Sequence, residues 1–188
     1  QYLIRKSSSN SNKNLDKLTK FFSQDELNTL SRRSVSIVGT NGKTTTATVL
    51  NNIISGKGLS TLLFTSPHLV SLNERIQINK EMIKDAELDT GMQMIKLFEK
   101  ENNIVLGYFE SIFLIAARKF LDERLDIFIA EAGIGGRLDT TSILKSQTVC
   151  LTNIGLDHTE LLGTTITEIL YEKIHVSKKV NNFINGSE

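Results

Sequence analysis

One short segment constrains the fold of this chain more than any other. Residues 36–50 read SIVGTNGKTTTATVL, an apolar run followed by glycines, a lysine and three threonines. VSIV (35–38) predicts a short buried strand, and residues 45–57 predict a helix. With STLLF (60–64) as a second strand, the segment predicts a β-α-β unit, and such a unit belongs to a parallel sheet.

The loop between this strand and helix is typical of a phosphate-binding loop. Backbone N–H groups and the positive end of the helix converge there, which suits a phosphate chain. Glycines permit the tight turn, Lys43 would neutralise the β- and γ-phosphates, and a threonine hydroxyl is an oxygen ligand for Mg²⁺. The general pattern G-x-x-x-x-G-K-[ST] would need a glycine where Ile37 stands, so this is the shorter form G-x-x-G-K-T. The expected nucleotide-binding residues are Gly39, Thr40, Asn41, Gly42, Lys43, Thr44 and Thr45.

The apolar pattern along the rest of the chain predicts an α/β fold. The runs 126–132 and 148–154 are too continuously apolar for an exposed face, so we expect central, mostly parallel strands with helices on both faces of the sheet. Further helices are expected within residues 15–33 and 86–100 and from near Thr164. Stretch 108–124 predicts a helix with a core-facing stripe of Phe109, Ile112, Phe113, Ala116, Ala117, Phe120 and Leu121.

Charge and hydropathy exclude several functional classes. Lys and Arg number 22 against 21 Asp and Glu, so no basic field recruits nucleic acid or an anionic membrane. Apolar runs fall short of the roughly 18 residues of a membrane span. The single cysteine, Cys150, is expected to be a small buried side chain, which suits a reducing compartment. We expect a cytoplasmic monomer that binds small molecules.

Three further segments carry a family resemblance: TSPHLVSLNERIQIN (65–79), AEAGIGGRLDTTS (130–142) and TNIGLDHTELLG (152–163). With GTNGKT, they closely resemble the folylpolyglutamate synthase and dihydrofolate synthase family of the Mur ligase superfamily, over roughly residues 20–180. Ser-Pro-His-Leu and Gly-Gly-Arg-Leu-Asp favour the folate branch over the cell-wall ligases. The resemblance implies an ATP- and Mg²⁺-dependent ligase that makes an acyl phosphate on a folate or dihydropteroate carboxylate and then joins it to the amine of L-glutamate.

The resemblance also implies a catalytic and metal site. Glu131 ends one predicted strand, and Asp157 and His158 follow the next strand along the chain, so we expect two adjacent strand ends to face one crevice. The implied Mg²⁺ ligands are a loop hydroxyl (Thr44 or Thr45), Glu131 and His158. Mg²⁺ prefers oxygen ligands, so a hydrogen-bonded role without metal remains an alternative for His158. A salt bridge remains an alternative for Glu131.

Lys173 matches the family position at which a lysine is carbamylated and becomes an oxygen ligand for a second metal. The neighbouring residues Tyr171 and Ile174-His175-Val176 depart from the family pattern, so a plain surface lysine on a helix remains an alternative. The resemblance thus implies a catalytic set of Lys43, Glu131, His158 and Lys173.

A second group of residues is implied on the substrate side. Ser66, Pro67 and His68 are expected to form a rigid loop, because Pro67 is the only proline and restricts the residue before it. By resemblance this loop borders the folate pocket, Asp139 contacts the pterin, and Arg75 contacts an anion. Ordinary salt bridges are the alternative for Arg75 and Asp139. Thr140 and Ser142 stand where Ala and Asn are usual, so pterin binding stays open.

The sequence predicts a flexible lead-in over residues 1–14 and an ATP-binding ligase domain over 15–188. Little sequence follows Lys173, so we expect an incomplete domain without the glutamate-binding C-terminal domain, and a fragment that is inactive alone. Two alternatives remain: a truncated, non-catalytic ATP-binding module, and a Mur ligase that acts on a cell-wall precursor.

Overall fold

The structure is a computed structural model that describes residues 15–187. The predicted lead-in, residues 1–14, lies outside the described residues. The first described helices, α2 (Asp16–Thr19) and α3 (Gln24–Arg33), confirm that helices lie within residues 15–33, as predicted. A capping box begins α3, because the Ser23 side chain accepts from the N–H of Glu26 and the Glu26 carboxylate accepts from the N–H of Ser23.

The predicted β-α-β unit is present. It consists of β1 (Ser34–Val38), α4 (Lys43–Gly56) and β2 (Thr61–Phe64). The helix begins at Lys43, earlier than predicted, because Gly42 in a left-handed conformation (φ +78°) already turns the chain into it. Lys43 and Thr44 therefore lie in the first helical turn rather than in the loop.

The remaining elements follow in chain order. Helices α5 and α6 confirm the predicted helices at 86–100 and 108–124, and α8 confirms the one expected near Thr164. The elements are η1 (Leu72–Arg75), β3 (Ile76–Ile78), β4 (Glu81–Met82), α5 (Asp85–Asn102), α6 (Tyr108–Asp122), β5 (Ile127–Glu131), η2 (Thr140–Leu144), β6 (Thr148–Leu151), α7 (Thr159–Leu162), α8 (Ile166–Ile174) and β7 (Asn182–Asn185).

The strands form one seven-stranded sheet in the order β4-β3-β2-β5-β1-β6-β7. Strands β2, β5, β1, β6 and β7 pair in parallel, whereas β3 and β4 run antiparallel. The mostly parallel sheet is confirmed. We expected the strand that ends at Glu131 (β5) and the strand before Asp157 (β6) to be neighbours. This expectation is wrong, because β1 lies between β5 and β6. The phosphate loop that follows β1 therefore lies between them.

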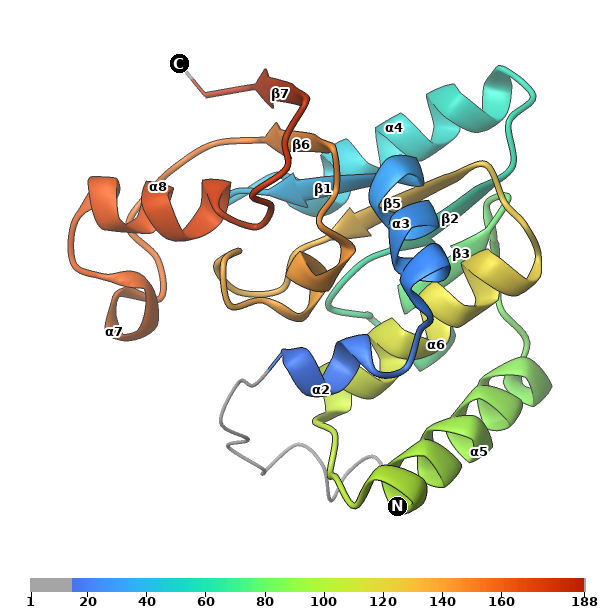
Figure 1. Ribbon diagram of the computed structural model, residues 1–188. Coiled ribbons are helices and arrows are strands. Elements are labelled where there is room, and N and C mark those ends of the chain that lie inside the picture. Colours follow the sequence, from blue (N-terminus) through green and yellow to red (C-terminus); the bar gives the residue numbers. More distant parts are fainter. Residues whose placement is uncertain (1–14, 188) are drawn as a thin grey trace.

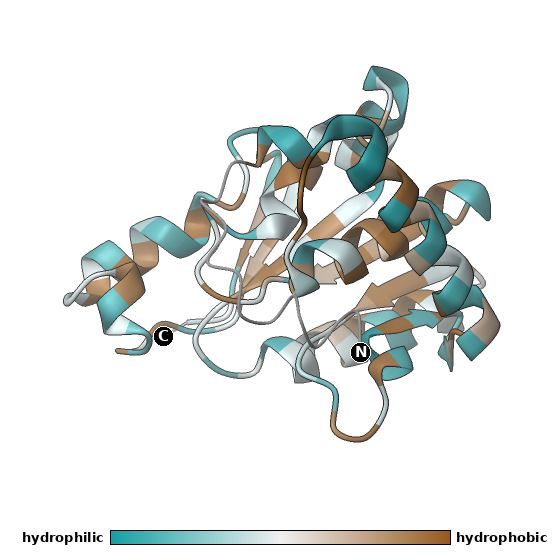
Figure 2. Ribbon diagram, turned by 90° about the horizontal axis from the view of Figure 1, so that it is seen from below, coloured by the Kyte–Doolittle hydropathy of each residue, from teal (hydrophilic) through white to brown (hydrophobic). Residues whose placement is uncertain are grey.

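Helices cover both faces of the sheet, as predicted (Figure 1). Helix α4 packs Ala47 on one face, against Ile37, Leu63 and Ile129. Helix α6 packs the predicted stripe on the opposite face, and α8 lies on that face beside β6. Hydrophobic residues concentrate on the strands and on the inner sides of the helices (Figure 2). Cys150 is buried under α4, as predicted.

Two further features differ from the sequence prediction. The strand predicted over 148–154 ends at Leu151, because the chain beyond it turns to contact the phosphate loop. The short strands β3, β4 and β7 were not predicted, since β4 has two residues and β7 exposes every side chain. No helix within residues 15–187 is long and apolar enough to cross a membrane.

Candidate phosphate-loop and metal site

The phosphate loop presents backbone donors at the start of α4. The first intrahelical bond joins the N–H of Thr46 to the carbonyl of Gly42 at 2.9 Å. The N–H groups of residues 42–45 precede that bond, so they have no acceptor within the helix. Free N–H groups at the positive end of a helix suit an anion. The prediction of a nucleotide phosphate site at this loop thus has a structural basis.

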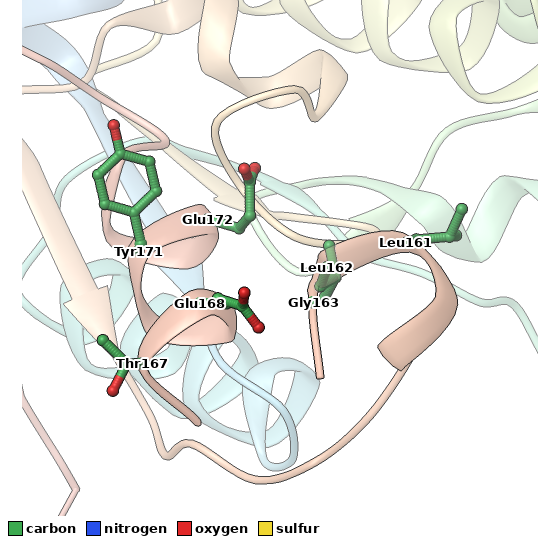
Figure 3. A pocket seen from close by; sticks show the side chains of 7 residues that line it. All are labelled: Leu161, Leu162, Gly163, Thr167, Glu168, Tyr171 and Glu172. Carbon is green, nitrogen blue, oxygen red and sulfur yellow. The ribbon is translucent and has the colours of Figure 1, made fainter. Parts of the chain in front are cut away.

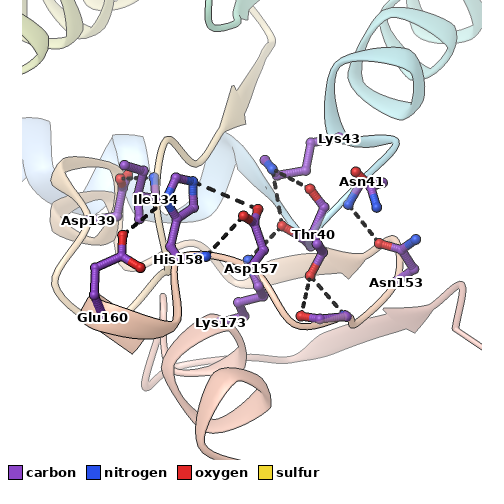
Figure 4. Close-up of polar contacts among 12 residues, drawn as sticks. Thr40, Asn41, Lys43, Ile134, Asp139, Asn153, Asp157, His158, Glu160 and Lys173 are labelled. Atoms are coloured by element: carbon purple, nitrogen blue, oxygen red, sulfur yellow. Dashed lines mark hydrogen bonds and ion pairs between the residues drawn. The ribbon is translucent and has the colours of Figure 1, made fainter. Parts of the chain in front are cut away.

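A second loop, residues 152–155, holds the phosphate loop from the side (Figure 4). The Thr40 N–H donates to the Asn153 carbonyl at 3.0 Å, and the Asn41 N–H donates to Asn153 Oδ1 at 2.8 Å. These two N–H groups are therefore committed within the protein, which leaves the N–H groups of residues 42–45 for phosphate. Sequence reasoning missed Asn153, since no spacing rule links residues so far apart in the chain.

Gly39 marks the closest approach between the two loops. Its φ is +153°, and a Cβ on Gly39 would overlap Thr152 Oγ1. The Thr152 hydroxyl donates to the Asn41 carbonyl at 2.6 Å. Glycine is required here both by the backbone conformation and by the contact.

Two lysine ammonium groups share one acceptor of the phosphate loop. Lys43 Nζ donates to the carbonyls of Gly39 and Thr40, both at 3.1 Å. Lys173 Nζ donates to the same Gly39 carbonyl at 2.7 Å. Lys173 is only 3% exposed, and burial together with the charge of Lys43 lowers its pKa to about 8, against the opposing effect of Asp157 and Asp139. The alternative of a plain surface lysine is therefore wrong.

Glu131 lies beside the first turn of α4. The Thr44 hydroxyl donates to its carboxylate at 2.8 and 3.0 Å, and the Ser66 N–H donates at 3.1 Å. Burial raises the pKa of Glu131, while these hydrogen bonds and the charges of Lys43 and Arg75 oppose that shift. The carboxylate has no salt-bridge partner among the ion pairs of the described residues, so the salt-bridge alternative gains no support there.

His158 is more open than the other candidates. Its side chain is 42% exposed and lies 3.7 Å from the Asp157 carboxylate and 3.9 Å from the Glu160 carboxylate (Figure 4). Within residues 15–187, no three His, Cys, Asp or Glu side chains form a cluster that could hold a metal. The implied roles of His158 and of the exposed Thr45 as metal ligands stay predictions.

The oxygen donors at the loop fit Mg²⁺. Mg²⁺ in phosphate sites takes one or two protein oxygens together with phosphate oxygens and water. The Thr44 hydroxyl and the Glu131 carboxylate are such donors, and they already contact each other. The pair fits the metal by donor chemistry.

On the substrate side, the loop at residues 66–71 is held at both ends. Ser66 contacts Glu131 as above, and the Ser66–Pro67 peptide bond is cis. At the other end, the Glu74 carboxylate accepts from the N–H groups of residues 69–71 at 2.6–2.8 Å. The loop leaves Leu69 and Val70 each 91% exposed. Its backbone is fixed although two apolar side chains face solvent.

Arg75 is buried and lies against the same loop. Its Nε donates to His68 Nδ1 at 2.8 Å, and its guanidinium lies 5.3 Å from the centre of the Tyr108 ring. An arginine only donates, so His68 Nδ1 accepts and the ring proton lies on Nε2. Anion binding by Arg75 stays a prediction.

Asp139 organises the loop that follows β5. Its carboxylate accepts from the N–H groups of Gly133, Ile134 and Thr141 and from the Thr141 hydroxyl, at 2.7–3.2 Å. These donors explain how an acidic side chain is tolerated in a buried position. The contact of Asp139 with a pterin stays a prediction.

A cavity of about 440 Å³ lies between α7 and α8 (Figure 3). None of the candidate residues lines it. Its lining residues are Leu161, Leu162, Gly163, Thr167, Glu168, Tyr171 and Glu172.

The mostly parallel sheet, the short phosphate loop and the contact between Thr44 and Glu131 agree with the resemblance to the Mur ligase superfamily. Residues 37–185 match the family model described as the Mur ligase middle domain. The chain belongs to this family.

Its similar proteins lie in the folate branch. It is 40% identical over 144 residues to a dihydrofolate synthase/folylpolyglutamate synthase of Buchnera aphidicola, covering 77% of this chain and 34% of that protein. It is 37% identical over 145 residues to the Haemophilus influenzae enzyme of the same name, covering 77% and 32%. The chain thus spans about a third of the length of these relatives.

Solved structures agree with the sequence comparisons. The E. coli FolC structure in complex with ADP superposes with a TM-score of 0.84 at 31% identity, covering 92% of this chain and 42% of that one. A bifunctional folylpolyglutamate synthase/dihydrofolate synthase with Mn, AMPPNP and L-glutamate bound gives 0.86 at 32% identity, covering 99% and 45%. The family resemblance read from the motifs is confirmed.

Proposed function

We propose that this chain is the nucleotide- and metal-binding part of an ATP-dependent ligase of folate biosynthesis. The reaction joins L-glutamate to a folate or dihydropteroate carboxylate through an acyl phosphate. One observation carries the proposal: the Thr44 hydroxyl at the start of α4 contacts the buried Glu131 carboxylate. Two oxygen donors therefore meet where a nucleotide's terminal phosphates would lie. The names of the relatives support the substrate class.

The chemistry requires an activated carboxylate. A carboxylate is a poor electrophile, and transfer of a phosphoryl group to it creates a good leaving group for the attacking amine. The N–H groups of residues 42–45 would orient the phosphates, and Lys43 would turn from its loop carbonyls toward the β- and γ-oxygens. Mg²⁺ bound by Thr44 and Glu131 would neutralise charge on those oxygens.

We assign the acceptor substrate to the side of the Ser66–His68 loop. Arg75 fixes the His68 ring so that its Nε2 proton is the one available to an acceptor. The Arg75 charge lies near Glu131, so it would attract an anionic carboxylate toward the phosphates. Asp139 would border the same pocket.

We further propose that Lys173 carries a carbamate, with His158 close to the metal. A carbamate at Lys173 would be an anion beside the Lys43 ammonium, whereas the free lysine places two cations at one carbonyl. We place the protein in the cytoplasm as a monomer that binds small molecules, and we expect the glutamate amine to be bound by a further domain.

Calorimetric titration of the purified chain tests the proposal. AMPPNP should bind in a Mg²⁺- or Mn²⁺-dependent way, and dihydropteroate or tetrahydrofolate should bind as well. Binding of a UDP-muramyl peptide in place of both pteridines would contradict the folate assignment and favour a cell-wall precursor. Nucleotide binding without binding of any of these acceptors would favour a non-catalytic module.

The ligation step is tested with labelled glutamate. We expect these 188 residues alone, given ATP, Mg²⁺ and the preferred pteridine, to form no labelled folate. They span about a third of the length of the relatives, and the amine must be held with water excluded by a closing domain. Labelled product from the chain alone would contradict this division of labour.

A further inference from the structure

The loop that follows β5 packs directly on the backbone of α8. A Cβ on Gly136 would overlap the Lys173 carbonyl oxygen and would lie 2.6 Å from the Glu172 carbonyl oxygen and 2.9 Å from Lys173 Cα. No side chain fits between loop and helix at this point. The contact is therefore one of backbone against backbone, and it falls on the two residues Glu172 and Lys173.

The next residue, Arg137, caps the end of α8 from the loop. Its backbone N–H donates to the Glu172 carbonyl at 2.7 Å. The helix ends at Ile174, so this carbonyl is one of the last four, which have no partner within a helix. The Arg137 side chain donates from Nε and Nη2 to Glu172 Oε1 at 3.0 and 2.7 Å, and this pairing raises the pKa of Arg137. A cation here also complements the negative end of the helix.

The capped turn carries Lys173. This side chain is buried, and its Nζ reaches the Gly39 carbonyl of the phosphate loop at 2.7 Å. Helix α8 has only nine residues, and helices this short are marginal unless other contacts hold them. The position of Lys173 Nζ therefore depends on the order of the final turn.

One segment connects the two sides of the site. It starts at Glu131, which contacts Thr44, and it reaches Gly136 and Arg137, which hold the helix of Lys173. This segment therefore links Glu131, which contacts Thr44 at the start of α4, to the helix of Lys173, which contacts the Gly39 carbonyl.

We propose that Arg137, together with Gly136, is a positioning residue that caps α8 and thereby holds Lys173 Nζ at the phosphate loop. The placement of Lys173 stands on the geometry alone, and its consequence for metal and nucleotide rests on the proposed function. Glu172 accepts the hydrogen bonds of the Arg137 side chain, and it also lines the cavity between α7 and α8. Figure 3 shows its carboxylate at the edge of α8.

The direct test is lysine labelling of the ligand-free chain in CO₂-free buffer, so that Lys173 is present as the free amine. An amine-reactive ester is added, peptides are analysed by mass spectrometry, and exposed Lys178 serves as the internal reference. Arg137→Ala keeps the backbone N–H that caps the Glu172 carbonyl but removes both side-chain bonds to Glu172 Oε1. Loss of this partly exposed ion pair lets the helix end open more often, so Lys173 should label about two- to fivefold faster. Arg137→Lys should be intermediate, because it keeps the cation but loses the planar fork. Arg32→Ala, at an exposed position on α3, is the matched control and should match the parent chain.

A second test separates positioning from general destabilisation. It is a double-mutant cycle of Arg137→Ala and Lys173→Met that measures how strongly AMPPNP affinity depends on Mg²⁺. The change in this dependence should be smaller in the double variant than the sum of the changes in the two single variants. Additive effects would overturn the role through Lys173. Unchanged Lys173 labelling in folded Arg137→Ala would overturn the proposal itself, even if the chain binds no nucleotide. Gly136→Ala is a supporting variant, and Arg137→Ala keeps the test valid if Gly136→Ala does not fold.

Discussion

At the scale of single residues, Lys43 is bound to carbonyls of its own loop and must be released to reach a phosphate. Lys43→Ala removes this cation and should weaken Mg·AMPPNP binding by roughly 10- to 100-fold, the range of a charge-assisted hydrogen bond. Lys57→Ala, at the other end of α4 and exposed, should leave the affinity unchanged. Titration calorimetry measures both. Equal affinities of the parent and a folded Lys43→Ala variant would contradict the phosphate-loop assignment.

Glu131 gives a prediction with a defined pH dependence. Its pKa is raised in the folded protein, so protonated Glu131 contributes stability that is complete below the unfolded value of about 4.3 and is lost as pH rises through the folded pKa. At pH 7 without metal, the chain therefore carries a buried carboxylate at a cost that glutamine avoids. Glu131→Gln should raise the free energy of unfolding at pH 7, and the gain should shrink toward pH 4.3.

Urea denaturation across this pH range measures the effect of Glu131→Gln. The same variant should lose the metal dependence of nucleotide binding, because glutamine is a weaker Mg²⁺ ligand than a carboxylate. A variant less stable than the parent at pH 7 would show that the hydrogen bonds from Thr44 and Ser66 outweigh burial.

Lys173 gives a second pH-dependent prediction. Its pKa of about 8 leaves more neutral amine near neutral pH than an ordinary lysine has. The neutral amine attacks CO₂, a C–N bond forms, and the proton leaves to solvent. With ¹³C-bicarbonate, an NMR carbamate signal should appear for the parent chain, grow as pH rises toward 8, and be absent from Lys173→Arg. A signal of equal size in Lys173→Arg would assign the carbamate elsewhere.

At the scale of elements, Gly39 in the loop before α4 and Gly56 at the end of α4 predict opposite effects. Gly39→Ala forces a side chain onto Thr152 at φ +153° and should cost about 2 kcal/mol or more. Gly56→Ala, at the end of the helix with nothing within 4 Å of the added Cβ, should stabilise by about 0.4–1 kcal/mol. Urea denaturation of the pair tests whether the strand–loop–helix unit is constrained at the loop rather than at the helix end. Two variants of equal stability would contradict it.

The sequence predicted those elements that carry a strong local pattern. Helix α6 and strands β1, β2, β5 and β6 followed from apolar spacing and from runs too apolar for a surface. The neighbours of β1 did not follow, because strand order is decided by pairing between distant segments. The antiparallel strands β3 and β4 were not predicted for a related reason. Strand β3 (Ile76–Ile78) has only three residues, and its extended conformation depends on pairing with β2.

The candidate site divides in the same way. Lys43 and Thr44 were predicted from the glycine–lysine–threonine pattern of the loop, and Glu131 from its place at a strand end together with the family resemblance. Asn153 and Arg137 were missed, because each acts by a contact with a segment remote in sequence. The string Gly-Gly-Arg-Leu-Asp was the available signal for Arg137, yet it was interpreted through the family and not through the helix that it touches.

At the scale of the whole molecule, the sheet order predicts a gradient of stability. Strand β1 is paired on both edges and covered on both faces, whereas β7 exposes every side chain and β4 lies at the other edge. Backbone amides of β1 should exchange with deuterium only on global unfolding, and those of β4 and β7 should exchange orders of magnitude faster. Hydrogen-exchange mass spectrometry tests this, and uniform protection across the sheet would contradict it.

The central place of β1 also matters while the chain is being made on the ribosome. Thr40 and Gly155 are hydrogen-bonded across 115 residues of sequence. When β1 emerges, the strands that flank it have yet to be translated, so its two edges have no native partner in the nascent chain. The phosphate loop therefore cannot mature in the order of synthesis. It reaches its binding shape in a late step, after residues 152–155 have left the exit tunnel.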